Sequence, residues 1–217
     1  MKCKIIKVCG MRDADNIRAV ENLLIGSKVP SDRFMGFIFW QKSGRYVCEK
    51  PAYMPKGVKR VGVFVNEDVE KVKQIADDYQ LDYIQLHGSE SPEYVSRLKG
   101  MRVIKAFNIA TNTDLEQTLA YEHIPDGGKV DMFLFDTKGK IVGGNGVKFD
   151  WNVLAAYSGD TPFILSGGIG PDDAESVASF HHEKCVGIDL NSRFEISPGL
   201  KDVKKLASFI DRLEDKK

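Results

Sequence analysis

The chain has 217 residues, 42% hydrophobic and 29% charged, which is the composition of an ordinary globular domain. Lysine plus arginine and aspartate plus glutamate each total 31, and this zero formal net charge argues against a nucleic-acid or membrane surface as partner. No signal-peptide segment or run of about 20 apolar residues is present, and the four cysteines form no CxxC pair, so we expect a cytoplasmic protein without a zinc site or a disulfide framework.

Eight short apolar runs recur along the chain, with helical patterns between most of them. Successive runs begin about 20 to 30 residues apart, which is the length of a βα unit with short loops. Strands that alternate with helices form a parallel sheet, and eight such units suffice to close a barrel. We therefore predict an α/β fold, a single (β/α)8 TIM barrel with eight parallel strands, as one domain over residues 1–217. The predicted strands are Lys4–Val8, Met35–Trp40, Arg60–Val65, Tyr83–Leu86, Val103–Phe107, Met132–Phe135, Phe163–Leu165 and Val186–Leu190.

The segments between these runs carry recognisable helix signals. The first predicted helix ends at Gly26, and Asn66 is expected to cap the helix after the third strand. Ser91-Pro92 and Gly170-Pro171 place a start signal before two further helices. The segment Ser43–Lys59 holds two prolines and no clear periodicity, so its helix is expected to be short or irregular.

Reactive side chains follow several of the runs. They would lie at the carboxyl ends of the strands, where (β/α)8 barrels place their active sites. Cys9 follows the first strand and is either a base, if amides or a cation lower the pKa of its thiol, or a small buried residue. Asp136 follows Phe133-Leu134-Phe135, where a carboxylate is costly to bury unless it is paired or protonated. We interpret Asp136 as a general acid; the alternative is that it caps the loop that follows. His87 ends the fourth strand and either orients substrate or bonds neighbouring backbone.

Two neighbouring loops predict a phosphate site. Gly167 and Gly168 follow the seventh strand, and Asn191 and Ser192 follow the eighth, whose loops commonly bind phosphate in such barrels. Ordinary βα turns are the alternative reading of these loops.

Three further features are weaker. Gly144 and Gly146 belong to a glycine cluster, Gly143–Gly146, that suits a mobile lid, an anion cradle or a simple turn. Arg45 can present its fork to a substrate carboxylate, although a surface role is the more common one for arginine. No histidine pair shows metal-ligand spacing with a carboxylate, so we expect no metal.

Taken together, these motifs resemble the phosphoribosylanthranilate isomerase family, and in order and spacing they cover essentially the whole chain. The matching segments are Lys7-Val8-Cys9-Gly10-Met11, Phe37-Ile38-Phe39, Ser43-Gly44-Arg45-Tyr46, Val61-Gly62-Val63-Phe64-Val65-Asn66, Gln85-Leu86-His87-Gly88, Phe135-Asp136-Thr137, Gly143-Gly144-Asn145-Gly146, Phe149-Asp150-Trp151 and Leu165-Ser166-Gly167-Gly168.

The resemblance implies an intramolecular oxidoreductase of the aldose–ketose type that acts in L-tryptophan biosynthesis. It would convert N-(5-phosphoribosyl)anthranilate into 1-(2-carboxyphenylamino)-1-deoxyribulose 5-phosphate, an Amadori rearrangement that needs no cofactor. Carried over by matching positions, Asp136 would be the general acid, Cys9 the general base and Arg45 the ligand of the anthranilate carboxylate. The phosphate would lie at Gly167, Gly168, Asn191 and Ser192. We expect a small phosphosugar as the partner molecule and a monomer or homodimer.

The chain departs from the family pattern after the eighth strand. The family usually reads Ser-Gly-Val-Glu there, whereas this chain has Ser192-Arg193-Phe194-Glu195. Our hypothesis is that Arg193 adds charge to the phosphate site or packs over its rim. Two other functions compete with isomerisation: another phosphosugar-processing TIM barrel, or a non-catalytic phosphate-ligand-binding barrel, which would need neither Cys9 nor Asp136.

Overall fold

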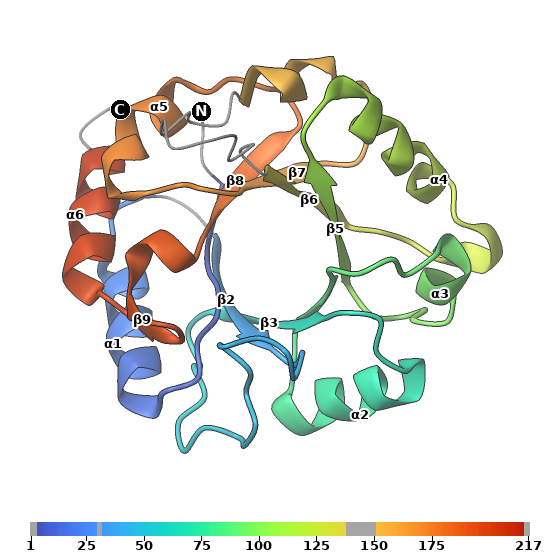
Figure 1. Ribbon diagram of the computed structural model, residues 1–217. Coiled ribbons are helices and arrows are strands. Elements are labelled where there is room, and N and C mark those ends of the chain that lie inside the picture. The colour runs from blue at the N-terminus through green and yellow to red at the C-terminus, as the bar shows by residue number, and fades with distance from the viewer. Residues whose placement is uncertain (1–3, 30–31, 138–150, 215–217) are drawn as a thin grey trace.

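The computed structural model describes residues 4–29, 32–137 and 151–214. Eight strands close into a barrel in the order β1 to β8, and every neighbouring pair is parallel, including β8 with β1. Figure 1 looks along the barrel, with the helices outside the ring of strands. The predicted (β/α)8 TIM barrel is therefore confirmed. The strands are β1 (Ile5–Val8), β2 (Asp32–Ile38), β3 (Lys59–Phe64), β4 (Tyr83–Leu86), β5 (Val103–Ile109), β6 (Met132–Thr137), β7 (Phe163–Ser166) and β8 (Cys185–Leu190).

The outer layer is made of α-helices and short 3-10 segments. A two-stranded antiparallel hairpin, β9 (Glu195–Ser197) with β10 (Leu200–Lys201), follows β8. No helix in the described part of the chain is long and apolar enough to cross a bilayer. The α-helices are α1 (Ala14–Gly26), α2 (Val69–Tyr79), α3 (Pro92–Ser96), α4 (Leu119–Glu122), α5 (Ala174–Ser179) and α6 (Val203–Glu214). The 3-10 segments are η1 (Asn112–Thr118), η2 (Pro125–Gly127), η3 (Trp151–Ala156), η4 (Pro171–Asp173) and η5 (Ser192–Phe194).

Helix starts follow local capping rules with one correction. The prediction that Asn66 caps the helix after β3 is wrong, because Asp68 accepts the hydrogen bonds from the first-turn amides of α2. Asn66 instead has a left-handed backbone (φ +50°), and its side chain accepts a hydrogen bond from the backbone amide of Ser89 at 2.8 Å. The predicted start of α3 is confirmed, with Ser91 as the cap and Pro92 in the first turn.

The connection from β2 to β3 contains no helix, whereas a short or irregular one was predicted there. Glu21 of α1 holds this long loop, since its carboxylate accepts hydrogen bonds from the Tyr53 hydroxyl and from the backbone amides of Lys56 and Gly57. These bonds lower the pKa of Glu21. The loop is therefore held against α1 by the buried Glu21 and by Arg18, whose guanidinium lies 4.0 Å from the centre of the Tyr53 ring.

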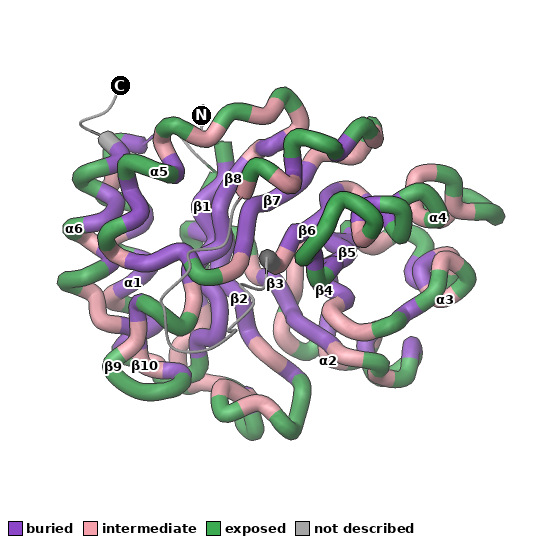
Figure 2. The backbone as a smooth tube through the Cα atoms, turned by 45° about the horizontal axis from the view of Figure 1, so that its top comes forward, coloured by how far each residue is buried: buried purple, intermediate pink, exposed green. Residues whose placement is uncertain are grey.

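Most residues of the barrel strands are buried (Figure 2), and the buried apolar side chains form two hydrophobic clusters. The larger cluster lies between the barrel and the helices. The smaller one fills part of the barrel interior and includes Phe34, Val61, Leu134 and Ile164. The interior also contains buried polar residues, and Lys7 is fully buried. Burial of a charged residue in this interior is costly unless it is paired, so a specific network is expected around it.

Candidate active site

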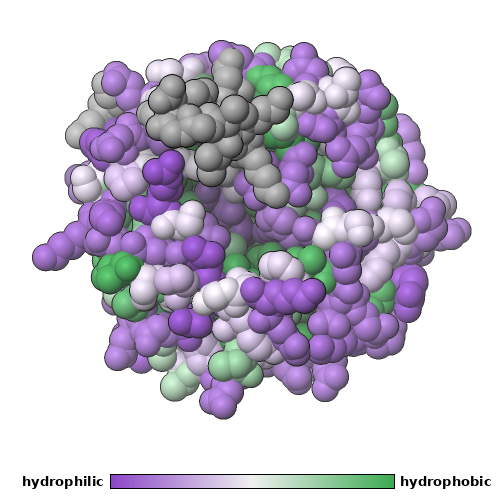
Figure 3. Space-filling view, viewed as in Figure 1, coloured by the Kyte–Doolittle hydropathy of each residue, from purple (hydrophilic) through white to green (hydrophobic). Residues whose placement is uncertain are grey.

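A pocket with a volume of about 170 Å³ opens at the carboxyl ends of the strands. Figure 3 shows this face of the molecule hollowed near its middle. Its position agrees with the rule that (β/α)8 barrels place their sites at this end. The predicted site residues that line the pocket are Cys9, His87, Asp136, Gly167, Gly168, Asn191 and Ser192.

The thiol of Cys9 lies at the end of β1 and is buried. Two opposing effects act on its pKa: burial raises it, and the neighbouring Lys7, through its charge and a hydrogen bond, lowers it. Burial is the larger effect, so the pKa of Cys9 lies above its ordinary value. Lys7 therefore acts in the direction that a base requires, but the net shift of the pKa in the ligand-free site is upward. At neutral pH the ligand-free site holds mainly the thiol.

The space for this thiol comes from a glycine on the adjacent strand. A Cβ atom added to Gly36 of β2 would lie 2.6 Å from the Cys9 Sγ atom and 3.1 Å from its Cα atom. The carbonyl oxygen of Gly36 also accepts hydrogen bonds from the amides of Gly10 and Met11, at 2.9 and 3.0 Å. The first βα loop is thus closely joined to β2, and any larger residue at position 36 would displace the thiol.

The carboxylate of Asp136 lies at the end of β6 and faces His87 of the β4 end. The His87 Nε2 atom is 3.4 Å from the Asp136 Oδ2 atom, and both side chains are about one quarter exposed. Gln85, two residues before His87, places its Nε2 atom 2.9 Å from the His87 Nδ1 atom. A chain of three polar side chains therefore orients the carboxylate in the pocket.

Residues of the loops after β7 and β8 line the same pocket. Gly167 and Gly168 both have positive φ angles, of +91° and +68°, a conformation that favours glycine. Successive amides in such conformations form a concavity suited to an anion. Ser192 begins η5 at the neighbouring loop. Asn191 also lines the pocket, and its Oδ1 atom accepts a hydrogen bond from the Lys201 Nζ atom at 2.8 Å.

Arg45 is not among the residues that line the pocket, and it belongs to a network with Glu195 that its position in the sequence did not reveal. Its Nε and Nη2 atoms donate to the two carboxylate oxygens of Glu195, at 2.6 to 3.0 Å. Lys201, which is fully buried, also contacts Glu195, at 2.7 Å. Both contacts lower the pKa of Glu195 although its burial acts in the opposite direction. Gly10 (φ +81°) lets this network approach the pocket, because a Cβ atom there would lie 2.6 Å from the Arg45 Cδ atom.

Comparison with known proteins decides the family. A family model described as N-(5'phosphoribosyl)anthranilate (PRA) isomerase matches residues 6–212. The chain belongs to this isomerase family.

Similar proteins cover nearly the full length of the chain. It is 48% identical to an N-(5'-phosphoribosyl)anthranilate isomerase of Parabacteroides distasonis, over 96% of this chain and 93% of the relative. The crystal structure of phosphoribosyl anthranilate isomerase from Thermotoga maritima has a TM-score of 0.75 at 30% identity, covering 98% of this chain and 99% of that one. A second crystal structure of a family member, in complex with reduced 1-(o-carboxyphenylamino)-1-deoxyribulose 5-phosphate, has a TM-score of 0.74 at 28% identity, with the same coverage.

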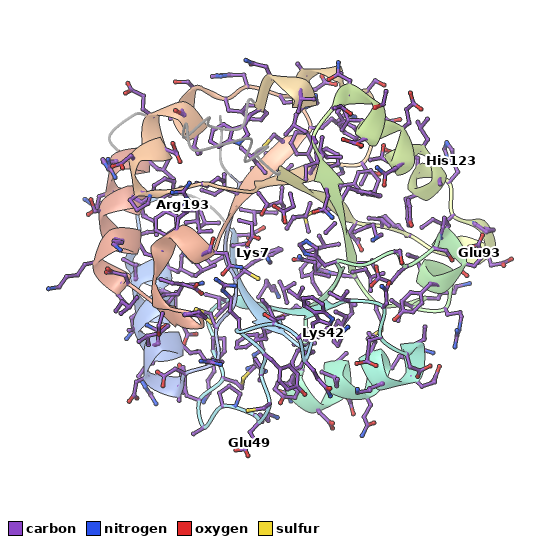
Figure 4. All side chains as sticks on the ribbon, viewed as in Figure 1. Lys7, Lys42, Glu49, Glu93, His123 and Arg193 are labelled. Atoms are coloured by element: carbon purple, nitrogen blue, oxygen red, sulfur yellow. The ribbon has the colours of Figure 1, made fainter. Side chains whose placement is uncertain are left out.

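The departure from the family pattern at Arg193 does not strain the backbone. Arg193 is not among the described residues with positive φ, so this position does not require glycine. Its side chain is exposed and passes the loop before α5, 3.7 Å from where a Cβ atom on Gly170 would lie. Figure 4 shows Arg193 outside the ring of strands, beside α5 and α6. The hypothesis that Arg193 adds charge at the phosphate loops remains a prediction.

Sequence reasoning did not identify several residues that support the site. They lie beneath or beside the predicted ones and carry buried polar side chains: Lys7, Gln85, Asp189, Glu195 and Lys201. A lysine or glutamine inside an apolar strand was the available signal for Lys7 and Gln85. The predicted lid residues Gly144 and Gly146 lie outside the described residues.

Proposed function

We propose that this chain catalyses the conversion of N-(5-phosphoribosyl)anthranilate into 1-(2-carboxyphenylamino)-1-deoxyribulose 5-phosphate. The observation that supports this most strongly is that Cys9 and Asp136, from β1 and β6, line one pocket together with residues of the β7 and β8 loops. The rearrangement needs an acid and a base on either side of a ribose, with a phosphate held nearby. The related crystal structure contains the reduced form of this same product, 1-(o-carboxyphenylamino)-1-deoxyribulose 5-phosphate.

Asp136 is the acid of the first step. Its protonated carboxyl group donates a proton to the furanose ring oxygen, the bond from C1′ to that oxygen breaks, and a Schiff base forms between C1′ and the anthranilate nitrogen. His87 contacts the same carboxylate and fixes its direction through the hydrogen bond between Gln85 and the His87 ring. The resulting orientation matters because small displacements of a catalytic group cost much of the rate.

Cys9 is the base of the second step. Its thiolate takes the proton from C2′, and the electron pair of that C–H bond moves toward the iminium, giving an enolamine. The enolamine then tautomerises to the ketone, so the reaction moves a hydrogen from C2′ to C1′ with no external oxidant. Since burial raises the pKa of Cys9, the reactive thiolate is a minor form of the ligand-free site at neutral pH and its fraction rises with pH.

The two anionic ends of the substrate have separate sites. The phosphate is held by the amide concavity of Gly167 and Gly168 together with Ser192, which needs no charged side chain. The anthranilate carboxylate binds to Arg45. Glu195 occupies the Nε and Nη2 edge of that guanidinium, and within the described residues Nη1 makes no hydrogen bond, so one edge remains for the substrate.

The test is turnover of freshly prepared phosphoribosylanthranilate, followed by its fluorescence. Wild type is expected to convert the substrate, and Cys9→Ala and Asp136→Ala are each expected to lose about 10²- to 10⁴-fold in kcat while they still bind the reduced product analogue. The non-catalytic binding barrel predicts binding by all three proteins and turnover by none. Full activity in either alanine variant would show that the acid and base are assigned to the wrong residues.

A further inference from the structure

A fully buried ion pair lies next to the Cys9 thiol. The Lys7 Nζ atom is 2.9 Å from the Asp189 Oδ1 atom, and the exposed fractions of the two side chains are 0% and 6%. The Ser166 hydroxyl donates to the Asp189 Oδ2 atom at 3.3 Å, so the carboxylate has a partner on each oxygen. Figure 4 shows Lys7 on the inner side of the ring of strands. These groups come from β1, β7 and β8 and meet only in the closed barrel.

Packing alone does not explain this pair. Other inward positions of the same barrel carry apolar side chains, such as Val61, Leu134 and Ile164. A buried ion pair generally stabilises a fold no better than apolar residues of similar volume, because both charges lose their hydration. A function that needs a cation at this place is therefore a better account of Lys7 than stability.

Three cations and one anion among the described residues act on the thiol or are affected by it. Lys7 and Asp189 act from β1 and β8, Lys201 from β10, and Arg45 from the loop after β2. Lys201 and Arg45 both form ion pairs with Glu195, which offsets their charge. Lys7 is also paired with a carboxylate, but it lies two residues before Cys9 on β1, so the two side chains face the same interior side of the barrel. Its partner Asp189 lines the pocket together with Cys9.

We propose that Lys7 is a positioning residue that stabilises the Cys9 thiolate by donating a hydrogen bond to its sulfur, and that Asp189 limits this effect by holding the same ammonium group. The inference rests on the proposed role of Cys9 as the base. Lys7 keeps all three of its protons throughout the cycle, and the proton taken from C2′ resides on sulfur. Asp189 opposes thiolate formation because its negative charge lies close to the sulfur.

Substitutions of Lys7 and of Asp189 are expected to shift the pKa of Cys9 in opposite directions. Lys7→Met removes the cation at similar side-chain volume, so the pKa of Cys9 should rise further. Asp189→Asn removes the anion, so Lys7 loses its carboxylate partner and takes the thiolate instead, and the pKa of Cys9 should fall. A role in folding alone predicts destabilisation by both substitutions and no opposite movement of the titration.

The experiment titrates Cys9 in the ligand-free protein by the ultraviolet absorbance of its thiolate. Each background is measured against the same protein carrying Cys9→Ala, which removes the contribution of the other cysteines. We expect the midpoint to move up by about one pH unit in Lys7→Met and down by about one unit in Asp189→Asn, each a tenfold change in thiolate fraction below the midpoint. The double variant Lys7→Met with Asp189→Asn removes both charges and should lie between the single variants.

Two results would overturn the inference: midpoints that move in the same direction, or a midpoint in Asp189→Asn that does not fall. The second criterion stands even if Lys7→Met fails to fold. Failure of the proposed function would look different. If Cys9→Ala were fully active, Cys9 would not be the base, but its thiol titration would still depend on Lys7 and Asp189.

Discussion

The substitution Gly36→Ala tests whether the glycine on β2 makes room for the catalytic thiol. The added Cβ atom would lie 2.6 Å from Sγ and 3.1 Å from Cα of Cys9, well inside the ~3.5 to 4.0 Å of a favourable contact between carbon atoms. Overpacking of this kind typically costs about 1 to 3 kcal/mol. For a chain of this size that corresponds to a Tm lower by about 2 to 12 °C. A displacement of the thiol by about 1 Å would lower kcat/KM by about 10²-fold.

The assay combines turnover with thermal unfolding, and the chain supplies a matched control. Gly26 at the end of α1 has no atom within 4 Å of an added Cβ, so Gly26→Ala should retain wild-type activity and stability. In a Cys9→Ala background the sulfur is gone, and the stability cost of Gly36→Ala should become smaller. Wild-type kcat/KM and Tm in Gly36→Ala would refute the steric explanation, as would an equal stability cost with and without the sulfur.

Two further predictions concern charged side chains. Glu195→Gln leaves Arg45 and the buried Lys201 without their carboxylate and should cost about 1 to 3 kcal/mol near neutral pH. Because the pKa of Glu195 is lowered on folding, its contribution is full above the unfolded value of about 4.3 and is lost as the pH falls through the folded value. Unfolding curves of wild type and Glu195→Gln should therefore converge in acid, and a constant difference down to about pH 3 would contradict this. For Arg193→Gly, KM should rise by a factor that shrinks with added salt if its charge reaches the phosphate; an unchanged KM across salt concentrations would show that it does not.

The local pattern of the sequence was sufficient for the barrel. Each apolar run could be recognised as a strand from its length and spacing, and the rule that chemistry lies at the carboxyl ends selected Cys9 and Asp136. For the start of α2, two nearby residues could both act as the N-cap, and the capping preference alone selected the wrong one. Asn66 and Asp68 are both good caps, and the contact of Asn66 with the Ser89 loop, more than 20 residues away in sequence, excluded Asn66.

The sequence by itself determined the eight strands and the reactive side chains near their carboxyl ends, because strand spacing and the closure of eight parallel units depend on short segments. The exact carboxyl ends of β2, β3, β5, β6 and β7 differ from the predicted ones by one or two residues. Only the tertiary structure decided how those residues are charged and held. Lys7 and Asp189 are 182 positions apart, and Arg45 and Glu195 are 150 apart, so no local pattern could pair them. The upward shift in the pKa of Cys9 also follows from burial inside the closed barrel, where the loss of hydration outweighs the nearby ammonium group.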